Sequence, residues 1–235
     1  MSKSLEGQLA LVTGASRGIG AATAEMLAAE GAHVILTART VAGLEAVEER
    51  IHDAGGNATI APLDLSDADG ITRLAEAISG RWKALDILVL NAATLGTLTP
   101  VPHIDAKEFA RVITLNLTSQ AAIIGAFDGM LRAAAGARVI GITSSVGASP
   151  RAYWGAYGAS KAGFDTLLGS YAEETRNIGR VKVAIIDPGA TRTAMRARAY
   201  PGEDPADVKA PEAVAARIAA LASAGFETGH RERIN

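Results

Sequence analysis

Tyr157 and Lys161 are the residues of this sequence whose types and spacing best suit acid–base chemistry. They stand four positions apart at the start of a predicted helix, so the phenol and the ammonium share one face. Reduction of a carbonyl to an alcohol needs a hydride from a cofactor and a proton from a general acid. A phenol is a weak acid at neutral pH, and a neighbouring cation stabilises its anion and lowers its pKa. The pair suits this proton transfer, although the same spacing also occurs on ordinary packed helices.

A glycine-rich turn, TGASRGIG over residues 13–20, follows the first predicted strand and opens the first predicted helix. Small residues there let the chain turn tightly, approach a pyrophosphate and pack the helix close to the strand. The free N–H groups of the helix N-terminus then bind phosphate. No Gly-Lys-Ser/Thr follows, which excludes a P-loop. We predict a dinucleotide site in which the turn contributes Gly14, Ser16, Arg17, Gly18, Ile19 and Gly20.

The end of the second predicted strand distinguishes between the two nicotinamide cofactors. A protein that binds NAD usually places Asp or Glu there, on the adenosine ribose. This chain instead reads Thr-Ala-Arg-Thr over residues 37–40. Arg39 and Arg17 would both reach a 2′-phosphate, which a planar guanidinium binds well. The sequence therefore favours NADP(H) over NAD(H), and the alternative is that Arg39 simply lies in solvent.

The elements that position these residues alternate along the chain between apolar runs of strand length and segments with helical periodicity. Continuous apolar runs are typical of parallel strands that are buried on both faces. Strict alternation predicts an α/β fold, a Rossmann-type doubly wound parallel sheet of about seven strands with helices on both faces. We expect a single domain over residues 1–235, with a flap over the substrate site around 194–211. The predicted strands are 8–13, 33–38, 58–63, 86–91, 138–143 and 181–186, and the predicted helices are 18–30, 41–54, 67–80, 105–135, 155–178 and 210–223.

In order and spacing, these motifs resemble the short-chain dehydrogenase/reductase family over nearly the whole chain. The catalytic residues of that family match Asn116, Ser144, Tyr157 and Lys161. The resemblance implies that Tyr157 donates the proton and that Lys161 lowers its pKa and binds the nicotinamide ribose. It also implies that Asn116 anchors a water relay to the lysine. Ser145 is the alternative to Ser144, and the family's register between strand and serine favours Ser144.

The resemblance also extends the cofactor site beyond the glycine turn, Arg39, Tyr157 and Lys161. Ala93 departs from the family, because it replaces the glycine that closes an Asn-Asn-Ala-Gly loop and adds a methyl group beside the cofactor. The strings at 154–157 and 191–196 resemble the YciK-like branch, which does not fix the substrate. The tail after residue 227 lacks the family's closing Asp-Gly pair. The added cofactor residues are Asp64, Leu65, Asn91, Ala92, Pro188, Gly189, Thr191 and Thr193.

The composition excludes several classes of function. The 235 residues carry 23 basic and 25 acidic side chains, and this balance argues against a nucleic-acid or anionic-membrane partner. Cysteine is absent, which excludes a thiol nucleophile and thiolate metal sites, and the four histidines are scattered, so we expect no metal. The longest uncharged stretch, 87–104, contains prolines and polar residues and does not suit a membrane span. No signal peptide precedes the first strand, so the cytoplasm is the expected location.

The sequence thus predicts an oxidoreductase that transfers a hydride between NADP(H) and a small carbonyl or alcohol substrate. A non-catalytic NADP(H)-sensing or scaffolding protein is the alternative, and the complete acid–base set argues against it. A lyase or dehalogenase on the same scaffold is disfavoured by the retained lysine and glycine turn. The substrate pocket should have an apolar wall, with Arg151 or Arg192 available for an anion.

The resemblance further implies a homotetramer or homodimer that pairs the helices at 105–135 and 155–178. Packing of these helices on the sheet explains their apolar faces equally well. Tyr153 and Trp154 suit either a pocket wall or a subunit interface.

Overall fold

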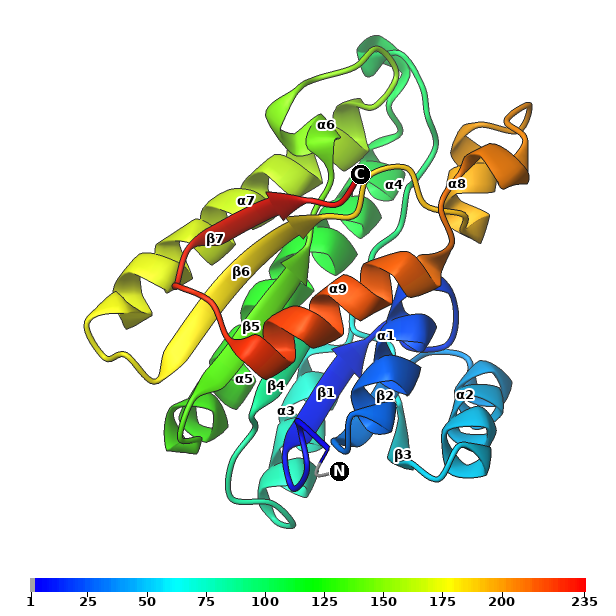
Figure 1. Ribbon diagram of the computed structural model, residues 1–235. Helices are drawn as coiled ribbons and strands as arrows, with labels where there is room; N and C mark the ends of the chain where they lie inside the picture. The colour runs from blue at the N-terminus through cyan, green and yellow to red at the C-terminus, as the bar shows by residue number, and fades with distance from the viewer. Residues whose placement is uncertain (1–2) are drawn as a thin grey trace.

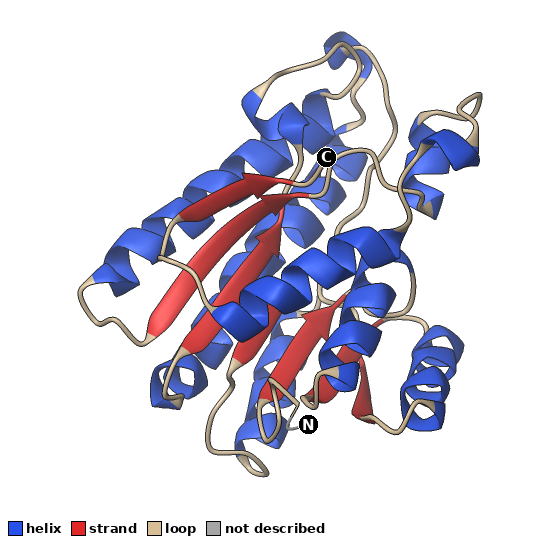
Figure 2. Ribbon diagram, in the orientation of Figure 1, coloured by secondary structure: helices blue, strands red, loops and turns tan. Residues whose placement is uncertain are grey.

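The computed structural model describes residues 3–235 as one parallel sheet between two layers of helices (Figures 1 and 2). Seven strands pair in the order β3-β2-β1-β4-β5-β6-β7, and each neighbouring pair runs parallel. This confirms the predicted fold class. The strands are β1 (Leu9–Thr13), β2 (His33–Ala38), β3 (Asn57–Pro62), β4 (Ile87–Leu90), β5 (Ala137–Ile142), β6 (Val181–Asp187) and β7 (His230–Arg233).

The helices cover both faces of the sheet, and each face has its own apolar core. One core joins the sheet to α1, α2 and α9, and the other joins it to α3, α5 and α7. The central strands are almost wholly buried, as the continuous apolar runs predicted. The α-helices are α1 (Gly18–Ala29), α2 (Val41–Asp53), α3 (Ala68–Ser79), α4 (Ala106–Ile113), α5 (Ser119–Ala133), α6 (Ser145–Ala148), α7 (Gly155–Arg176), α8 (Ala194–Ala199) and α9 (Pro211–Ala224).

Strand β7 does not have the pattern by which the other strands were predicted. Its four residues, His-Arg-Glu-Arg, are all polar, and it lies at the edge of the sheet against β6. An edge strand needs no apolar run, because only one of its sides is covered by a neighbouring strand. Its pairing with β6 is the reason that this polar tail is a strand.

The predicted helix at 105–135 consists of three segments. Helix α4 ends at Ile113, a π-helical turn follows over Thr114–Thr118, and α5 then begins at Ser119. A π-turn inside a helix is rare and often marks a functional site. Here the turn contains Asn116, which is a predicted catalytic residue.

Most of the apolar residues on α5 and α7 are already buried within the chain. The core that joins the sheet to α3, α5 and α7 contains Ile123, Phe127, Phe164 and Leu168. Their burial therefore reflects packing on the sheet, and subunit pairing stays a prediction. No helix within residues 3–235 has both the length and the apolar character that a membrane crossing requires.

Candidate active site

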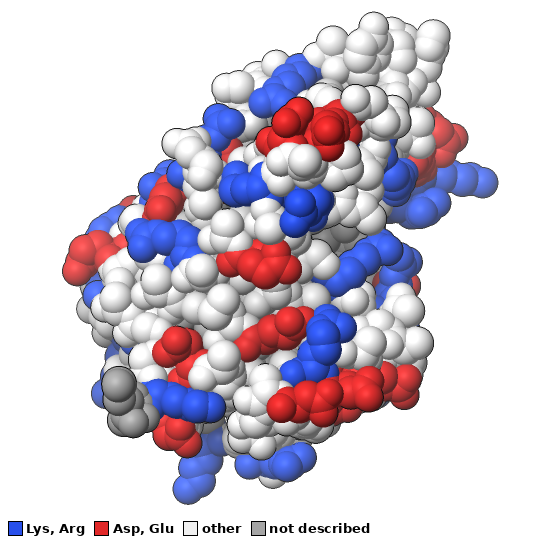
Figure 3. Space-filling view, turned by 45° about the vertical axis from the view of Figure 1, so that its right-hand side comes forward, with Lys and Arg blue, Asp and Glu red and all other residues white. Residues whose placement is uncertain are grey.

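A cavity of about 670 Å³ lies at the carboxyl ends of the strands. Its walls come from the segments that follow the first six strands, together with α7 and α8. Strand order reverses between β1 and β4, and doubly wound sheets bind their ligands at such a switch point. Figure 3 shows basic side chains bordering the hollow on the right-hand side of the molecule.

The glycine turn packs directly against the loop that follows β4. Gly14 has φ +65°, and a Cβ atom there would lie 2.9 Å from Asn91 Nδ2. A Cβ atom on Gly20 would overlap the carbonyl oxygen of Gly14. Both positions therefore require glycine for this close approach. Helix α1 begins at Gly18 without a side-chain cap, which leaves its N-terminal N–H groups available for phosphate.

Thr13 joins the two halves of this site, a role that the sequence analysis missed. Its Oγ1 accepts hydrogen bonds from the backbone N–H groups of Asn91 at 2.9 Å and Ala92 at 3.0 Å. The Asn91 amide in turn donates to the Thr13 carbonyl at 2.9 Å. These bonds fix the backbone beside Gly14, where Ala92 and Ala93 line the cavity. The sequence signal for this role was a polar residue, threonine, at the end of the apolar first strand.

Arg17 and Arg39 line the part of the cavity that lies beyond the ends of β1 and β2. Both side chains are exposed, and Arg39 Nη1 lies 3.9 Å from Asp64 Oδ2. Ser66 donates two hydrogen bonds to Asp64, which lower the pKa of that carboxyl. Leu65 lines the cavity, whereas the Asp64 side chain is occupied by Ser66 and Arg39. Of the two predicted cofactor residues that follow β3, Asp64 and Leu65, only Leu65 therefore lies on the cavity wall.

The segment after β6 forms the opposite wall and includes Pro188, Gly189, Thr191 and Thr193. Gly189 has φ +61°, and a Cβ atom there would lie 2.6 Å from the Ile234 carbonyl oxygen. Thr193 Oγ1 accepts from the backbone N–H of Arg196 and caps α8, so its methyl group faces Gly18. Thr193 thus joins the wall to the glycine turn.

Tyr157 and Lys161 lie on the inner face of α7, and both are buried. Lys161 Nζ donates a 2.7 Å hydrogen bond to the carbonyl oxygen of Ile142 at the end of β5. It also lies 5.8 Å from the centroid of the Tyr157 ring. The face shared by phenol and ammonium, predicted from their spacing, is present in this structure.

The electrostatics of this pair differ from the sequence expectation. Burial lowers the pKa of Lys161 to about 8, although the Asp165 carboxylate opposes the shift. Burial and the Asp187 carboxylate raise the pKa of Tyr157 above its ordinary value. In this cofactor-free arrangement the expected lowering of the Tyr157 pKa is not seen, because removal from water and the Asp187 carboxylate both favour the neutral phenol. In this arrangement the phenol is protonated at neutral pH, as a proton donor must be.

The two candidate serines have different surroundings. Ser144 lines the cavity beside Tyr157, and its hydroxyl does not cap α6. Ser145 Oγ instead accepts a 3.0 Å hydrogen bond from Arg151. Of the two serines, Ser144 is therefore the one on the cavity wall.

Asn116 is buried in the π-turn and connects two elements. Its Oδ1 accepts from the Thr94 N–H at 2.8 Å, and its Nδ2 donates to the Thr94 carbonyl and to Ser160 Oγ. Ser160 Oγ donates in turn to the Tyr157 carbonyl at 2.7 Å. The side chain thus links the loop after β4 to the start of α7, and it makes no bond to Lys161 among the residues described. A water relay from Asn116 stays a prediction.

Comparison with known proteins agrees with this geometry. Residues 8–204 match the sequence model of the family described as short chain dehydrogenase. The chain belongs to the short-chain dehydrogenase/reductase family. It is 34% identical over 210 residues to the oxidoreductase YciK of Escherichia coli (strain K12), covering 88% of this chain and 82% of YciK.

Two further proteins are similar over nearly their whole lengths. The cis-4-hydroxycyclohexanecarboxylate dehydrogenase of Sinomonas cyclohexanicum is 34% identical, with 97% of this chain and 95% of that enzyme covered. A short chain dehydrogenase of Shigella flexneri, solved in complex with NADP, superposes with a TM-score of 0.94 at 32% identity. The superposition covers 99% of both chains. The family and these relatives support oxidoreduction with a nicotinamide dinucleotide.

Proposed function

We propose that this protein is an NADP(H)-dependent oxidoreductase that interconverts a carbonyl compound and its alcohol, with Tyr157 as the proton donor. One observation carries the proposal: a single cavity joins the phosphate-binding glycine turn to the buried pair of Tyr157 and Lys161. Ser144 lies on the same wall. The presence of Ser144, Tyr157 and Lys161 argues against a sensing or scaffolding protein, because such a protein would need only the glycine turn to bind the cofactor.

The residues at the phosphate end fit a dinucleotide. The glycine turn leaves room for a pyrophosphate against the uncapped N-terminus of α1. Arg17 and Arg39 present two guanidinium groups where the adenosine ribose would lie, and the end of β2 carries no carboxylate. These features favour NADP(H), and the NADP complex of the Shigella flexneri protein is consistent with that preference. When bound, the cofactor supplies or accepts the hydride.

The chain's own residues supply the rest of the reaction. Ser144 donates a hydrogen bond to the substrate oxygen and holds the carbonyl beside the phenol. Tyr157 transfers its proton to that oxygen as the carbon is reduced. Lys161 places a positive charge behind the phenol and stabilises the tyrosinate that remains. Asn116 holds the start of α7, and hence Tyr157, against the loop after β4.

NADPH binding followed by turnover tests this proposal. We expect NADPH to bind in the micromolar range or tighter, and NADPH oxidation to depend on an added ketone or aldehyde. Binding without turnover across a broad panel of ketones, aldehydes and quinones would favour the sensing alternative.

We further propose that the protein is cytoplasmic and forms a homodimer or homotetramer. Light scattering at micromolar concentration would test the oligomeric state.

A further inference from the structure

The cavity is strongly basic. Among residues 3–235, its wall contains no Asp or Glu and six basic side chains. The phosphates of a dinucleotide account for those near the glycine turn and β2, and Lys161 belongs to the catalytic pair. The remaining basic residues follow β6 or lie on α8. The six are Arg17, Arg39, Lys161, Arg192, Arg196 and Arg198.

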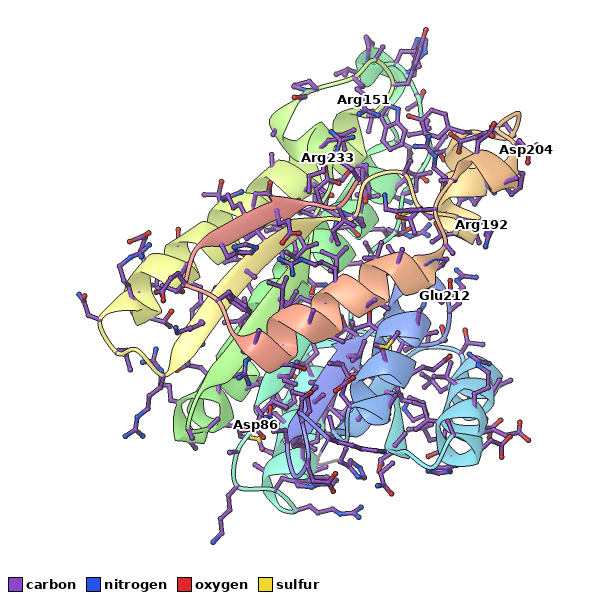
Figure 4. The ribbon with its side chains drawn as sticks, viewed as in Figure 1. Asp86, Arg151, Arg192, Asp204, Glu212 and Arg233 are labelled. Atoms are coloured by element: carbon purple, nitrogen blue, oxygen red, sulfur yellow. The ribbon has the colours of Figure 1, made fainter. Side chains whose placement is uncertain are left out.

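The arginines around α8 differ in whether another side chain of the protein already binds their guanidinium group. Arg196 is paired with Glu203 through two hydrogen bonds, from Nε at 2.7 Å and from Nη2 at 2.5 Å. Arg151 lies outside the cavity wall and donates to Ser145 Oγ and to the Tyr200 hydroxyl. Arg192 lies between β6 and α8, in the segment that matches the cofactor site (Figure 4).

Arg198 lies outside the segments that match the cofactor site, and no acidic side chain within residues 3–235 pairs with it. Among the residues described, it forms no ion pair, and its one hydrogen bond runs from Nη2 to the Gly96 carbonyl at 3.3 Å. This bond crosses from α8 to the loop after β4. Gly96 has φ +67°, and a Cβ atom there would lie 2.7 Å from a methyl carbon of Val112, so the position requires glycine. The exposed guanidinium is therefore in contact with the loop after β4 through one nitrogen, and its remaining N–H groups have no partner in the described part of the chain.

The surroundings of Arg198 belong to the substrate end of the cavity. A separate apolar cluster surrounds Tyr157 and includes Met195 and Ala199 of α8, the helix that carries Arg198. Leu95 of the same cluster stands next to Gly96, to which Arg198 is bonded. Trp154 lies edge-on to Tyr157, with 5.9 Å between ring centroids. A ligand whose reacting group lies at the buried Tyr157 would thus contact these apolar side chains, with the exposed Arg198 at the α8 end of the cluster.

We propose that the substrate is a carbonyl compound with an apolar body and a carboxylate remote from the carbonyl, and that Arg198 binds this carboxylate. The inference rests on the proposed function. In the reduction, a C–H bond forms at the carbonyl carbon by hydride transfer, and the oxygen takes its proton from Tyr157. NADPH is oxidised to NADP⁺, and the carboxylate is unchanged. Its charge holds the molecule with the carbonyl toward Tyr157 and the apolar body against the cluster.

Matched pairs of oxo acids and their methyl esters test this assignment. The pairs are 4-oxocyclohexanecarboxylate, 4-formylbenzoate and 5-oxohexanoate, each with its ester, at pH 7. We expect kcat/KM to be at least tenfold higher for the acid of the best pair. Arg198→Gln should lower kcat/KM for that acid by about 10–100-fold, as expected for a lost charge-assisted hydrogen bond, and change that for the ester less than threefold. Arg198→Lys, which keeps the charge, should recover part of the loss.

Two controls separate this inference from the proposed function. Arg111→Gln removes an exposed arginine of α4 outside the cavity and should leave the ratio of acid to ester unchanged. Calorimetric titration of the NADP⁺-loaded enzyme with cyclohexanecarboxylate should show weaker binding in Arg198→Gln. Equal kcat/KM for acid and ester, or equal losses for both in Arg198→Gln, would overturn the carboxylate site while the reductase stands. Absence of turnover for acids and esters alike would overturn both.

Discussion

The Nζ atom of Lys161 lies 5.8 Å from the ring centroid of Tyr157 and donates its hydrogen bond to a backbone carbonyl instead of the phenol. The role that we propose for the lysine, stabilising the tyrosinate, therefore depends on its charge and not on a hydrogen bond to the phenol. Burial removes the ammonium from water and so destabilises its charged form, which lowers the pKa of Lys161 to about 8. The same burial keeps the phenol protonated. The phenol of the cofactor-free site therefore carries the proton that it would donate in the proposed reduction.

The raised pKa of Tyr157 is directly measurable. Ultraviolet titration of the cofactor-free protein at 295 nm follows tyrosinate formation, and Tyr157→Phe identifies the contribution of this residue. We expect wild type and variant to give the same absorbance change up to pH 10, because burial and Asp187 hold the phenol neutral. An extra tyrosinate in the wild type with a midpoint below 9 would contradict the cofactor-free electrostatics described above.

The lowered pKa of Lys161 predicts a pH-dependent cost in stability. The folded pKa of about 8 lies below the ordinary 10.5, so the folded state binds this proton less tightly than the unfolded state. The cost is complete below pH 8 and disappears as the pH rises through 10.5. Relative to Lys161→Met, the wild type should therefore gain about 3 kcal/mol in free energy of unfolding between pH 8 and 10.5. Urea denaturation of both proteins at each pH measures this, and a constant difference would exclude the shift.

Replacement of Arg39 tests cofactor choice. Arg39→Ala should weaken NADPH binding by about tenfold, a modest loss because the side chain is exposed, and leave NADH binding within about twofold. Ala38→Asp should move the preference toward NADH, since a carboxylate repels the 2′-phosphate and accepts hydrogen bonds from ribose hydroxyls. Fluorescence titration with both cofactors gives the affinities, with Arg111→Ala as the exposed-arginine control. Equal effects of Arg39→Ala on NADPH and NADH would remove the argument for a 2′-phosphate site.

The two serines should respond differently to substitution. Ser144→Ala should lower kcat/KM by about 10²–10³-fold, the range for loss of one donor to a developing oxyanion. Ser145→Ala removes only the bond to Arg151 and should cost less than about fivefold. Steady-state kinetics with one carbonyl substrate compares the two. A larger loss in Ser145→Ala would reverse their roles.

Local sequence patterns predicted the central sheet well, because buried parallel strands are continuous apolar runs and glycine turns carry their own steric requirement. The missing parts depend on contacts between distant segments. β7 is a strand only because β6 is beside it, and the π-turn at Asn116 forms where its amide meets Thr94 and Ser160. The bond from Lys161 to Ile142 likewise depends on how α7 packs on β5. The raised pKa of Tyr157 in the cofactor-free site was not predicted, since spacing reveals the nearby cation but neither the burial nor the Asp187 carboxylate.

Single-turnover reduction by Tyr157→Phe tests the central claim most directly. The enzyme is loaded with NADPH, mixed with a carbonyl substrate that the wild type reduces with a rate-limiting chemical step, and followed at 340 nm. Removal of the phenolic oxygen removes the proton donor and leaves the glycine turn untouched. We predict a loss of about 10²–10⁴-fold or more in the rate of NADPH oxidation, with NADPH affinity within about twofold of wild type. A variant that oxidises NADPH at the wild-type rate would contradict the assignment of Tyr157 as the proton donor.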